Sequence, residues 1–553
     1  MKYPIKYILV FVVSLFVLVF TTTCTSTKTD KDKRTVFNYN EMQGISSLDP
    51  VMATNIENIW PVNQLFNGLL QMNDSLRVIP CIAKKWFISA DGLTYTFILR
   101  NDVRFHNNKC FNNEKGRLVT AKDFVFSLNR LYDPRVSGAL SYVTNIDRTE
   151  KTNYKGFSAE NDSTLIIYLK EPFSAFLSTL TMSYFSVVPF EAIEMYGQDF
   201  RRNPVGTGPF TFKMWDEGTK LVLIKNETYF EFEGKNRLPY LDAVTVSFVK
   251  DKETSFMELL NGKYDMLSGA DAFNINEVLD KNGNLQHEYE KKFTLQKQTF
   301  LKTDYLGILV DDKIDIVKKS PLRIKALRKA INYGFDRAKM VKFFRNNIGF
   351  PATEGFIPRG LPSYNASIVK GYTYNPEKVR QLLIEAGYPE GKNLPEITLH
   401  TTELFLEQLE FIQSQLAENN IHIKISVDKS SVLRQSVSSC EYNFFKKNWI
   451  ADYADEENCL SLFYSKNFTP IGSNYTHYKN PDFDILFEKA IKEQNYQVQQ
   501  VLYQQMDQIL IDDAPIVPLF YDQVIRLVHK NINNLTTNPM NLLNLKSVKK
   551  INQ

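Results

Sequence analysis

Hydrophobic and polar residues alternate along several short stretches of the chain. Residues 94–100 and 164–169 show this two-residue period, and it recurs at Val244, Val246 and Phe248. Polar or turn-forming residues bound each stretch. Because successive side chains of a strand point to opposite faces, the pattern predicts β-strands that bury one face in a core.

Helical periodicity occupies segments between these strands. Residues 120–123 are predicted to open a helix that ends before Pro134, with an apolar face made of Phe124, Phe126, Leu128 and Leu131. A second helical pattern spans residues 321–335, and Asp336 is expected to cap a third helix. A fourth covers residues 376–386 and is closed by Gly387. The mixture predicts an α/β fold, although periodicity leaves the order of the strands open.

The N-terminus carries an apolar run of a different kind. Residues 7–20 contain Ser14 as their one polar member and follow Lys2 and Lys6. This length is typical of a signal peptide and short for a membrane span. We therefore expect residues 1–23 to be a signal peptide that exports the chain.

Cys24 stands directly after this run and resembles the lipid-acceptor cysteine of a bacterial lipoprotein. Thr23 departs from the Gly, Ala or Ser usual at that place, so ordinary cleavage or an uncleaved anchor are the alternatives. Residues 24–35 are polar and rich in Lys and Asp, as suits a flexible tether between membrane and folded body.

Composition limits the classes of protein that remain. The 43% hydrophobic and 23% charged residues are ordinary for a large globular protein, and 553 residues predict two or three domains. The net charge of +4 is spread without a basic block beyond the tether, which argues against nucleic acid as a partner. The 13% aromatic share exceeds the needs of a core, so we expect some aromatic residues to line a cleft.

One segment has the composition of a cation-binding site. Residues 448–455 place Asp452 and Asp455 beside Trp449 and Tyr453. Such a cluster can hold an ammonium group in a partly dry pocket, where a charge-assisted hydrogen bond is about twice as strong as a neutral one. A turn or helix cap is the alternative role for an Asp in this setting.

An ordered series of short motifs runs through the chain, and its members share Gly, Pro, aromatic or acidic residues at set spacings. The series comprises residues 47–50, 65–70, Pro80, Ala83, Trp86, residues 91–97, 99–100, Val103, residues 105–106, 119–127, 206–210, 382–388, 449–453 and 514–521. In order and spacing it closely resembles the family 5 extracellular solute-binding proteins, which are the oligopeptide, dipeptide and nickel receptors of ABC importers. The resemblance covers residues from about 36 to 545.

The resemblance implies an α/β, two-lobed periplasmic-binding-protein fold of type II, with a hinge between the lobes and an extra domain. The implied boundaries are residues 36–67, 189–297 and 522–553 for lobe I, residues 68–188 for the extra domain, and residues 298–521 for lobe II. Ligand would be enclosed between the lobes by hinge closure.

The resemblance also assigns roles within the site. Asp452 would pair with the α-ammonium of a peptide, Trp449 would support it by packing, and Asp455 becomes a turn or cap residue. Main-chain groups near Asn448 and along residues 54–56 would bind the peptide backbone as an added strand. The candidate ligand-binding residues are Asp452, Trp449, Asn448, Thr54, Asn55, Ile56, Lys446 and Tyr521.

Three positions depart from the pattern of the oligopeptide receptors. Lys446 stands where Arg is found, so it would either attract a carboxylate as a point charge or be a surface lysine. Val432 replaces a pocket Trp, and Ile450 replaces a disulfide-forming Cys. The length and side-chain preference of the ligand are therefore left open.

Motifs for catalysis or metal binding are not found in the sequence. The six histidines are scattered without a close pair, and there is no GxSxG motif, so neither an enzyme, a cofactor nor a metal site is expected. Residues 206–209 predict a tight turn between strands built on φ-permissive glycines, and the Asp311–Asp312 pair predicts a cap or solvated turn. Cys440 and Cys459 are compatible with a disulfide or with free thiols, as are Cys81 and Cys110.

These features together favour a lipid-anchored monomeric receptor that captures di- or oligopeptides outside the membrane and delivers them to an ABC permease with its ATPase subunits. A receptor for another solute, such as a nickel chelate, haem or an oligosaccharide, is the alternative within binding proteins. A ligand-sensing lipoprotein or peptide chaperone is the alternative from another class.

Overall fold

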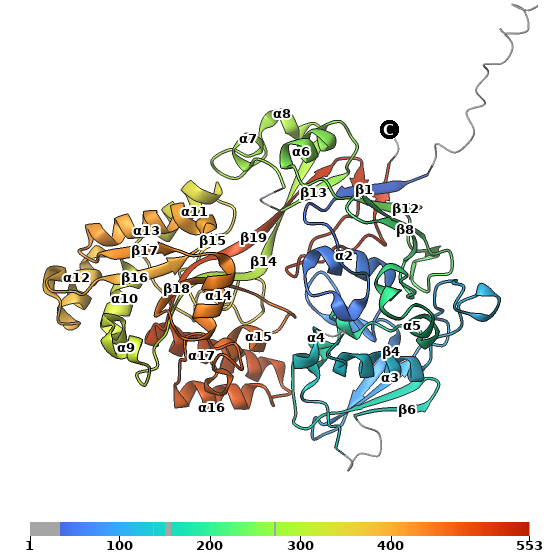
Figure 1. Cartoon of the computed structure of the whole chain (residues 1–553), viewed down its shortest axis with the longest axis horizontal. Coiled ribbons are helices and arrows are strands. Elements are labelled where there is room, and N and C mark those ends of the chain that lie inside the picture. Colours follow the sequence, from blue (N-terminus) through green and yellow to red (C-terminus); the bar gives the residue numbers. More distant parts are fainter. Residues whose placement is uncertain (1–33, 136–137, 150–155, 270–271, 552–553) are drawn as a thin grey trace, which may run out of the picture.

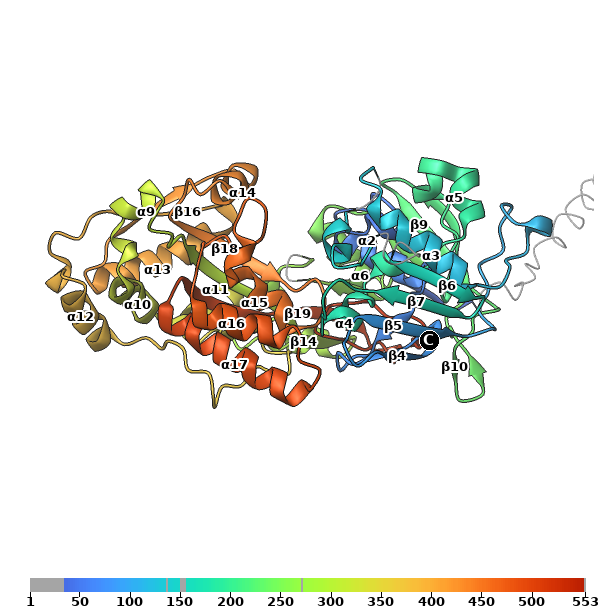
Figure 2. The same ribbon diagram turned by 90° about the horizontal axis from the view of Figure 1, so that it is seen from below.

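The structure is a computed structural model that describes residues 34–135, 138–149, 156–269 and 272–551. The chain forms two lobes that lie side by side, joined by two long strands, β14 (Phe293–Ile308) and β19 (Ile516–His529) (Figures 1 and 2). The predicted signal peptide, Cys24 and nearly all of the tether lie outside the described residues.

One mixed sheet runs through both lobes, in the order β17-β16-β18-β14-β19-β13-β1-β12-β9-β8, with β15 also paired to β19. The remaining strands are β17 (Ile423–Val427), β16 (Ile397–Thr401), β18 (Phe444–Ile450), β13 (Met266–Ser268), β1 (Val36–Asn40), β12 (Ala243–Ser247), β9 (Lys220–Lys225), β8 (Phe210–Asp216) and β15 (Phe350–Pro351). The central strands β14 and β19 are therefore shared between the lobes.

The pairing of β14 with β19 changes where one lobe passes into the other. Residues 293–299 pair with β19 beside β13, and residues 303–307 pair with it beside β18. The register shifts between Thr299 and Thr303. Such an irregularity interrupts the ladder and bends the strands, as a hinge requires. The expected boundaries after residues 297 and 521 both fall within these two strands.

The segment expected to be an extra domain carries its own sheet, β4-β5-β7-β6. Its strands are β4 (Ala83–Ile88), β5 (Thr94–Leu99), β7 (Thr164–Tyr168) and β6 (Phe157–Asn161), and it packs against α3 (Ala121–Asn129). The strands predicted at residues 94–100 and 164–169 are thus confirmed. Phe97 and Phe124 belong to the same core cluster as Phe37 and Val244 of the main sheet, so this domain and lobe I share a core.

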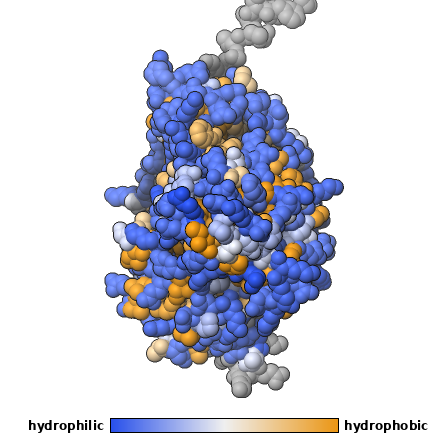
Figure 3. Space-filling model, turned by 90° about the vertical axis from the view of Figure 1, so that its left-hand side faces the viewer, coloured by the Kyte–Doolittle hydropathy of each residue, from blue (hydrophilic) through white to orange (hydrophobic). Residues whose placement is uncertain are grey.

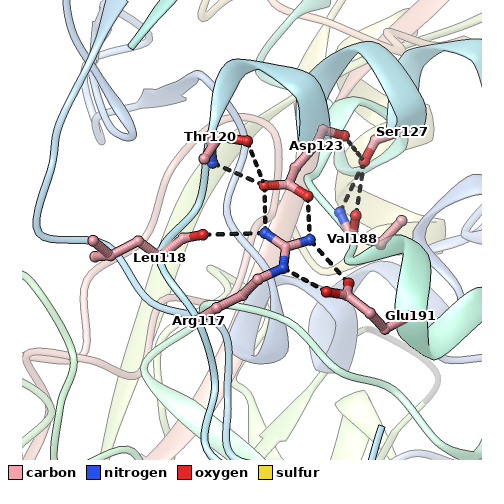
Figure 4. A network of polar contacts seen from close by, with 7 residues as sticks. All are labelled: Arg117, Leu118, Thr120, Asp123, Ser127, Val188 and Glu191. Atoms are coloured by element: carbon pink, nitrogen blue, oxygen red, sulfur yellow. Dashed lines mark hydrogen bonds and ion pairs between the residues drawn. The ribbon is translucent and has the colours of Figure 1, made fainter. Parts of the chain in front are cut away.

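A local ion-pair network fixes the start of α3 (Figure 4). The amide and hydroxyl of Thr120 both donate to the Asp123 carboxylate, at 2.8 and 3.0 Å. The Arg117 guanidinium lies between Asp123 and Glu191 of α5 (Phe190–Tyr196) and donates to both. The helix predicted to open at Thr120 is confirmed, and Arg117 ties it to a neighbouring helix.

Lobe II places helices on both sides of β16, β17 and β18 (Figure 1). They are α9 (Asp315–Lys319), α10 (Lys325–Tyr333), α11 (Arg337–Arg345), α12 (Pro376–Glu385), α13 (Leu406–Glu418), α14 (Ser430–Ser438), α15 (Glu456–Leu460), α16 (Pro481–Ala490) and α17 (Tyr496–Asp513). The pattern at residues 321–335 begins as a short 3-10 turn before α10. Asp336 caps α11 as predicted, accepting from the Lys339 amide at 3.0 Å.

Smaller elements complete lobe I and the extra domain. They are α2 (Ile56–Leu65), α4 (Phe176–Thr179), α6 (Lys252–Leu260), α7 (Ile275–Val278), α8 (His287–Glu290), β2 (Leu70–Met72), β3 (Val78–Pro80), β10 (Phe232–Glu233), β11 (Asn236–Arg237), β20 (Ile532–Asn533) and β21 (Lys549–Lys550). Helices α6, α7 and α8 cluster beside β13 around a core of their own (Figure 1).

One expectation, about residues 206–209, is corrected, and the alternative left open for the cysteines is decided. The segment at residues 206–209 precedes β8, but neither glycine has a positive φ. Both instead lie against the last turn of α2, where a Cβ on Gly206 would fall 2.0 Å from the Leu65 carbonyl oxygen. The four cysteines of the described ranges are free thiols, so the Cys440–Cys459 disulfide does not form.

Replacing Gly206 by Ala is therefore expected to destabilise the fold by about 1–3 kcal/mol, the usual cost of overpacking. The obstacle is backbone, which cannot rotate away as a flexible side chain would. Gly68→Ala is the matched control, because its nearest neighbour would lie at an ordinary 3.4 Å. Urea denaturation of both variants measures the difference, and equal midpoints would show that the close approach is unimportant.

Candidate functional site

A cavity of about 490 Å³ opens between the lobes. Its walls come from parts of the chain that are distant in sequence, among them the start of α2, the loop after α4, β14, the end of β18 with the segment after it, and residues 540–542. The principal residues are Thr54, Asn55, Ile56, Met182, Tyr184, Phe300, Ile450, Asp452, Tyr453 and Met540. The structure thus brings residues 54–56 to the same cavity as Asp452.

The Asp452 segment is organised by one side chain, that of Asn458 in α15. The Asn458 Oδ1 accepts from the Trp449 Nε1 at 3.0 Å and from the Asp452 amide at 3.1 Å. Its Nδ2 donates to the Asp452 Oδ2 at 3.3 Å. Both Trp449 and the carboxylate are therefore held in place before any ligand arrives.

Aromatic rings from both sides of the cleft surround this carboxylate. Tyr142 stacks on Tyr184, with ring centroids 5.8 Å apart, and meets the edge of Tyr453 at 6.3 Å. Tyr142 and Tyr184 belong to the extra-domain segment, whereas Tyr453 follows β18 in lobe II. Since tyrosine faces carry partial negative charge, this enclosure attracts cations as the carboxylate does.

The electrostatics of Asp452 agree with this geometry. The residue is exposed to the cleft, but protein atoms surround its carboxylate closely enough that burial raises its pKa, against hydrogen bonds from Asn458 and Tyr142 that lower it. Burial and then the Asp452 charge raise the pKa of Tyr184 to about 12. A positive ligand group would relieve both effects.

Asp455 is a helix cap, as predicted. Its carboxylate accepts from the Glu457 amide at 2.9 Å at the start of α15 and from the Tyr503 hydroxyl at 3.2 Å. Burial and the neighbouring Glu456 raise its pKa. Asp455 therefore positions the segment, and Asp452 lines the cavity, whose walls also include the half-buried Glu57 of α2.

Neither role expected for Lys446 is observed. Its side chain is 1% exposed, and its Nζ lies 2.6 Å from an Asp304 oxygen and 2.9 Å from the Lys447 carbonyl oxygen. Burial lowers the Lys446 pKa, whereas Lys446 and Lys302 together outweigh burial and lower that of Asp304. The buried Asp304 carboxylate thus forms ion pairs with two ammonium groups, those of Lys446 and Lys302.

The neighbouring Lys447 faces a second hollow, of about 690 Å³, together with Asn448 and Arg434. Its Nζ lies 3.7 Å from the centre of the Tyr475 ring, and no carboxylate of the described ranges forms an ion pair with it. Burial, then the charges of Lys446 and Arg434, lower its pKa to about 8. Lys447 thus has no ion-pair partner among the described residues, although the carboxylates of Glu403 and Asp428 also line this hollow.

The family model described as "Bacterial extracellular solute-binding proteins, family 5 Middle" matches residues 77–470. The chain belongs to this family.

Relatives and solved structures agree with this assignment over most of the chain. The glutathione-binding protein GsiB of Salmonella typhimurium is 28% identical over 506 residues, covering 89% of this chain and 90% of that protein. DppA of Helicobacter pylori, solved in complex with the peptide STSA, is 26% identical with a TM-score of 0.73, covering 94% of this chain and 99% of that one. HbpA2 of Haemophilus parasuis has a TM-score of 0.80 at 23% identity, covering 93% and 100%. The expected two-lobed periplasmic-binding-protein fold is confirmed.

Besides Lys446, a second residue expected in the site of this family 5 protein, Tyr521, does not reach the cleft. Tyr521 is fully buried in β19, and its hydroxyl donates to the Gly355 carbonyl oxygen at 2.7 Å. Because its side chain is buried, Tyr521 is not part of the site.

Two positions that depart from the pattern of the oligopeptide receptors are exposed. Ile450 is 46% exposed and lines the cavity, and Val432 is 43% exposed.

Sequence reasoning missed Tyr142, Tyr184 and Lys447. The high aromatic share predicted rings in a cleft but gave no means of choosing among 28 tyrosines.

Among the described residues, no group of three or more His, Cys, Asp or Glu side chains is arranged to hold a metal ion.

Proposed function

We propose that this family 5 protein is the substrate-binding component of an ABC importer, which captures di- or oligopeptides between its lobes and delivers them to a membrane permease with its ATPase subunits. The observation that carries the proposal is the Asp452 carboxylate held inside a ring of tyrosines at the junction of the lobes. The name of GsiB and the peptide complex of DppA support it.

In this proposal the peptide's α-ammonium is bound by Asp452 in the aromatic enclosure. Charge-assisted bonds and cation–π contacts both strengthen as the cleft closes and excludes water. Main-chain groups of residues 54–56 and near Asn448 hydrogen-bond the peptide backbone, a mode that tolerates many side chains. Closure bends the chain at the register shift between β14 and β19.

The carboxylate end of the ligand is assigned to Lys447 and Arg434 rather than to Lys446. The charge of Lys446 is already satisfied by Asp304, so a ligand carboxylate would have to break that pair. Lys447 instead gains by pairing, because a negative partner offsets the burial that lowers its pKa to about 8.

Native mass spectrometry of freshly purified protein tests the proposal. Co-purified masses that match peptides are expected. Haem, a nickel chelate or an oligosaccharide as the bound species would overturn it in favour of a receptor for another solute. A peptide-uptake assay in cells that lack the protein separates transport from sensing or chaperone activity, since unchanged uptake would exclude the importer role.

We further propose that the protein is exported, is anchored through a lipid on Cys24 and acts as a monomer. The apolar run before Cys24 supports the first two points. Hydrophilic residues cover most of the outer face of lobe II, and apolar ones gather only in small groups there (Figure 3), which supports the third. No helix within the described ranges is long and apolar enough to cross a membrane.

Binding of peptides with a free N-terminus is expected to weaken as the pH falls through the pKa of Asp452. Only the ionised carboxylate pairs with ammonium, and burial raises this pKa above the ordinary value of 3.8, so the loss begins at a higher pH than for an exposed Asp. Calorimetric titrations across the acidic range measure the effect. N-acetylated peptides serve as the control, and an equal pH dependence for both ligands would contradict the assignment.

A further inference from the structure

Three side chains from separate segments of lobe II meet away from the cleft: Cys440 between α14 and β18, His477 before α16, and Asp311 after β14. The Cys440 Sγ lies 3.2 Å from the His477 Nε2, and the His477 Nδ1 lies 3.5 Å from the Asp311 Oδ2. A thiol, an imidazole and a carboxylate are thus aligned in the order that activates a cysteine.

The surroundings of His477 favour its doubly protonated form. The Thr469 carbonyl oxygen, which can only accept, lies 3.0 Å from Nε2, and the Asp311 carboxylate lies beside Nδ1. Burial lowers the His477 pKa, but hydrogen bonds with Cys440, Asp311 and Thr469 outweigh it, so the net shift is upward. An imidazolium beside the sulfur stabilises a thiolate. The Phe468 ring stacks on the imidazole at 4.3 Å and fixes its orientation.

The backbone at this cluster is strained. Cys440 has a φ of 60° and His477 a φ of 49°, a region that residues other than Gly seldom adopt. Strain of this kind persists where surrounding structure holds it, and it gathers at functional sites. Cys440 is also half-exposed, unlike the buried Cys81 and Cys459, so a small reagent can reach it.

We propose that Cys440 is a reactive thiol that gives its proton to the adjacent His477 imidazole and takes up low-molecular-weight disulfides by thiol–disulfide exchange. The Cys440 sulfur attacks one sulfur of the disulfide RSSR and forms a Cys440–S–S–R bond while the S–S bond of the reagent breaks. Cys440 is oxidised, and the departing half of the reagent is reduced to RS⁻. That thiolate takes a proton from the His477 imidazolium and leaves as RSH, so charge and atoms balance.

This site is distant from the Asp452 end of the proposed peptide site, whereas Arg434 and Lys447, to which the ligand carboxylate is assigned, lie nearer to it. Cys440 precedes β18, whereas Asp452 follows the opposite end of the same seven-residue strand, about 20 Å away at ordinary strand geometry. Modification of Cys440 would therefore leave the Asp452 end of the cleft unoccupied.

Cys110 provides an internal control thiol. It is also half-exposed, but burial and the neighbouring Glu191 raise its pKa to about 11, against the opposing charge of Arg117. Exposure alone predicts similar reactivity for the two cysteines. Activation by His477 predicts that Cys440 reacts much faster.

The full chain incubated with cystine, with modified sites assigned by peptide mapping, tests the inference. Cys440 is expected to form the mixed disulfide faster than Cys110, because the His477 imidazole faces the Cys440 sulfur. His477→Gln and Asp311→Asn should slow Cys440 without affecting Cys110, and should reduce the ultraviolet absorbance of the thiolate. Equal rates for the two cysteines, or an unchanged Cys440 rate in folded Asp311→Asn, would overturn it. Thermal melting shows whether each variant is folded. If His477→Gln is misfolded, the Cys440 rate in Asp311→Asn decides the test.

Discussion

Asp452→Asn is expected to weaken the binding of peptides with a free N-terminus by about 30-fold to several thousandfold. Removing one charge of a buried, hydrogen-bonded pair costs about 2–5 kcal/mol, which converts to that range of affinity. Asn keeps the shape and can retain a bond to Asn458, so the segment should stay folded. Isothermal titration calorimetry measures the change.

A double-mutant cycle separates the ammonium contact from general damage. N-acetylation of the peptide should cost the wild type about as much as the substitution does, but should cost Asp452→Asn almost nothing further, because the same interaction is already lost. Asp482→Asn, an exposed carboxylate at the start of α16, is the matched control and should bind normally. Additive effects of acetylation and substitution would show that Asp452 does not contact the ammonium group.

Lys446→Met is expected to lower the free energy of unfolding by about 3 kcal/mol. It leaves the Asp304 carboxylate, which is fully buried, without its nearest partner, and breaking such a pair costs about 3–5 kcal/mol. The lower end applies because Lys302 remains 3.3 Å from Asp304. Lys302 also pairs with Asp522 of β19, which pairs with Arg345. One network of ion pairs therefore links both strands that join the lobes. Urea denaturation measures the loss.

Lys447→Met is the control for this prediction, and it should be neutral or stabilising. Its ammonium is half-buried without a carboxylate partner in the described part of the chain, so the substitution removes a desolvation cost rather than a pair. Adding Asp304→Asn to Lys446→Met should recover part of the lost stability. Equal destabilisation by the two neighbouring lysine substitutions would contradict the buried pair.

Local signals were the most reliable part of the sequence. Thr120 with Asp123 and Asp336 with the Lys339 amide form contacts within four residues, so the sequence alone places these helix starts. Gly206 shows the limit of such reasoning. Its absence of a side chain is needed for approach to Leu65, a contact between distant segments, and not for the turn in which it lies.

The two adjacent lysines show the same limit within the site. Side chains alternate across a strand, so one of Lys446 and Lys447 must face inward. The pairing of β18 with β14 decides which: it places Lys446 against Asp304, whereas Lys447 has no ion-pair partner among the described residues, although both lysines line the hollow. A matching position in the family pattern pointed to Lys446, but a charge already paired inside the protein is of little use to a ligand.

The sequence by itself determined the family, the two-lobed α/β class, the acidic–aromatic segment around Asp452 and the capping role of Asp455. These rest on ordered motifs and on contacts between near neighbours in the chain. Only the tertiary structure decided that Tyr142 and Tyr184 enclose Asp452, that Tyr521 is buried, and that Cys440 meets His477 and Asp311. Each of these depends on segments brought together by long-range sheet pairing and lobe contact, for which local periodicity carries no signal.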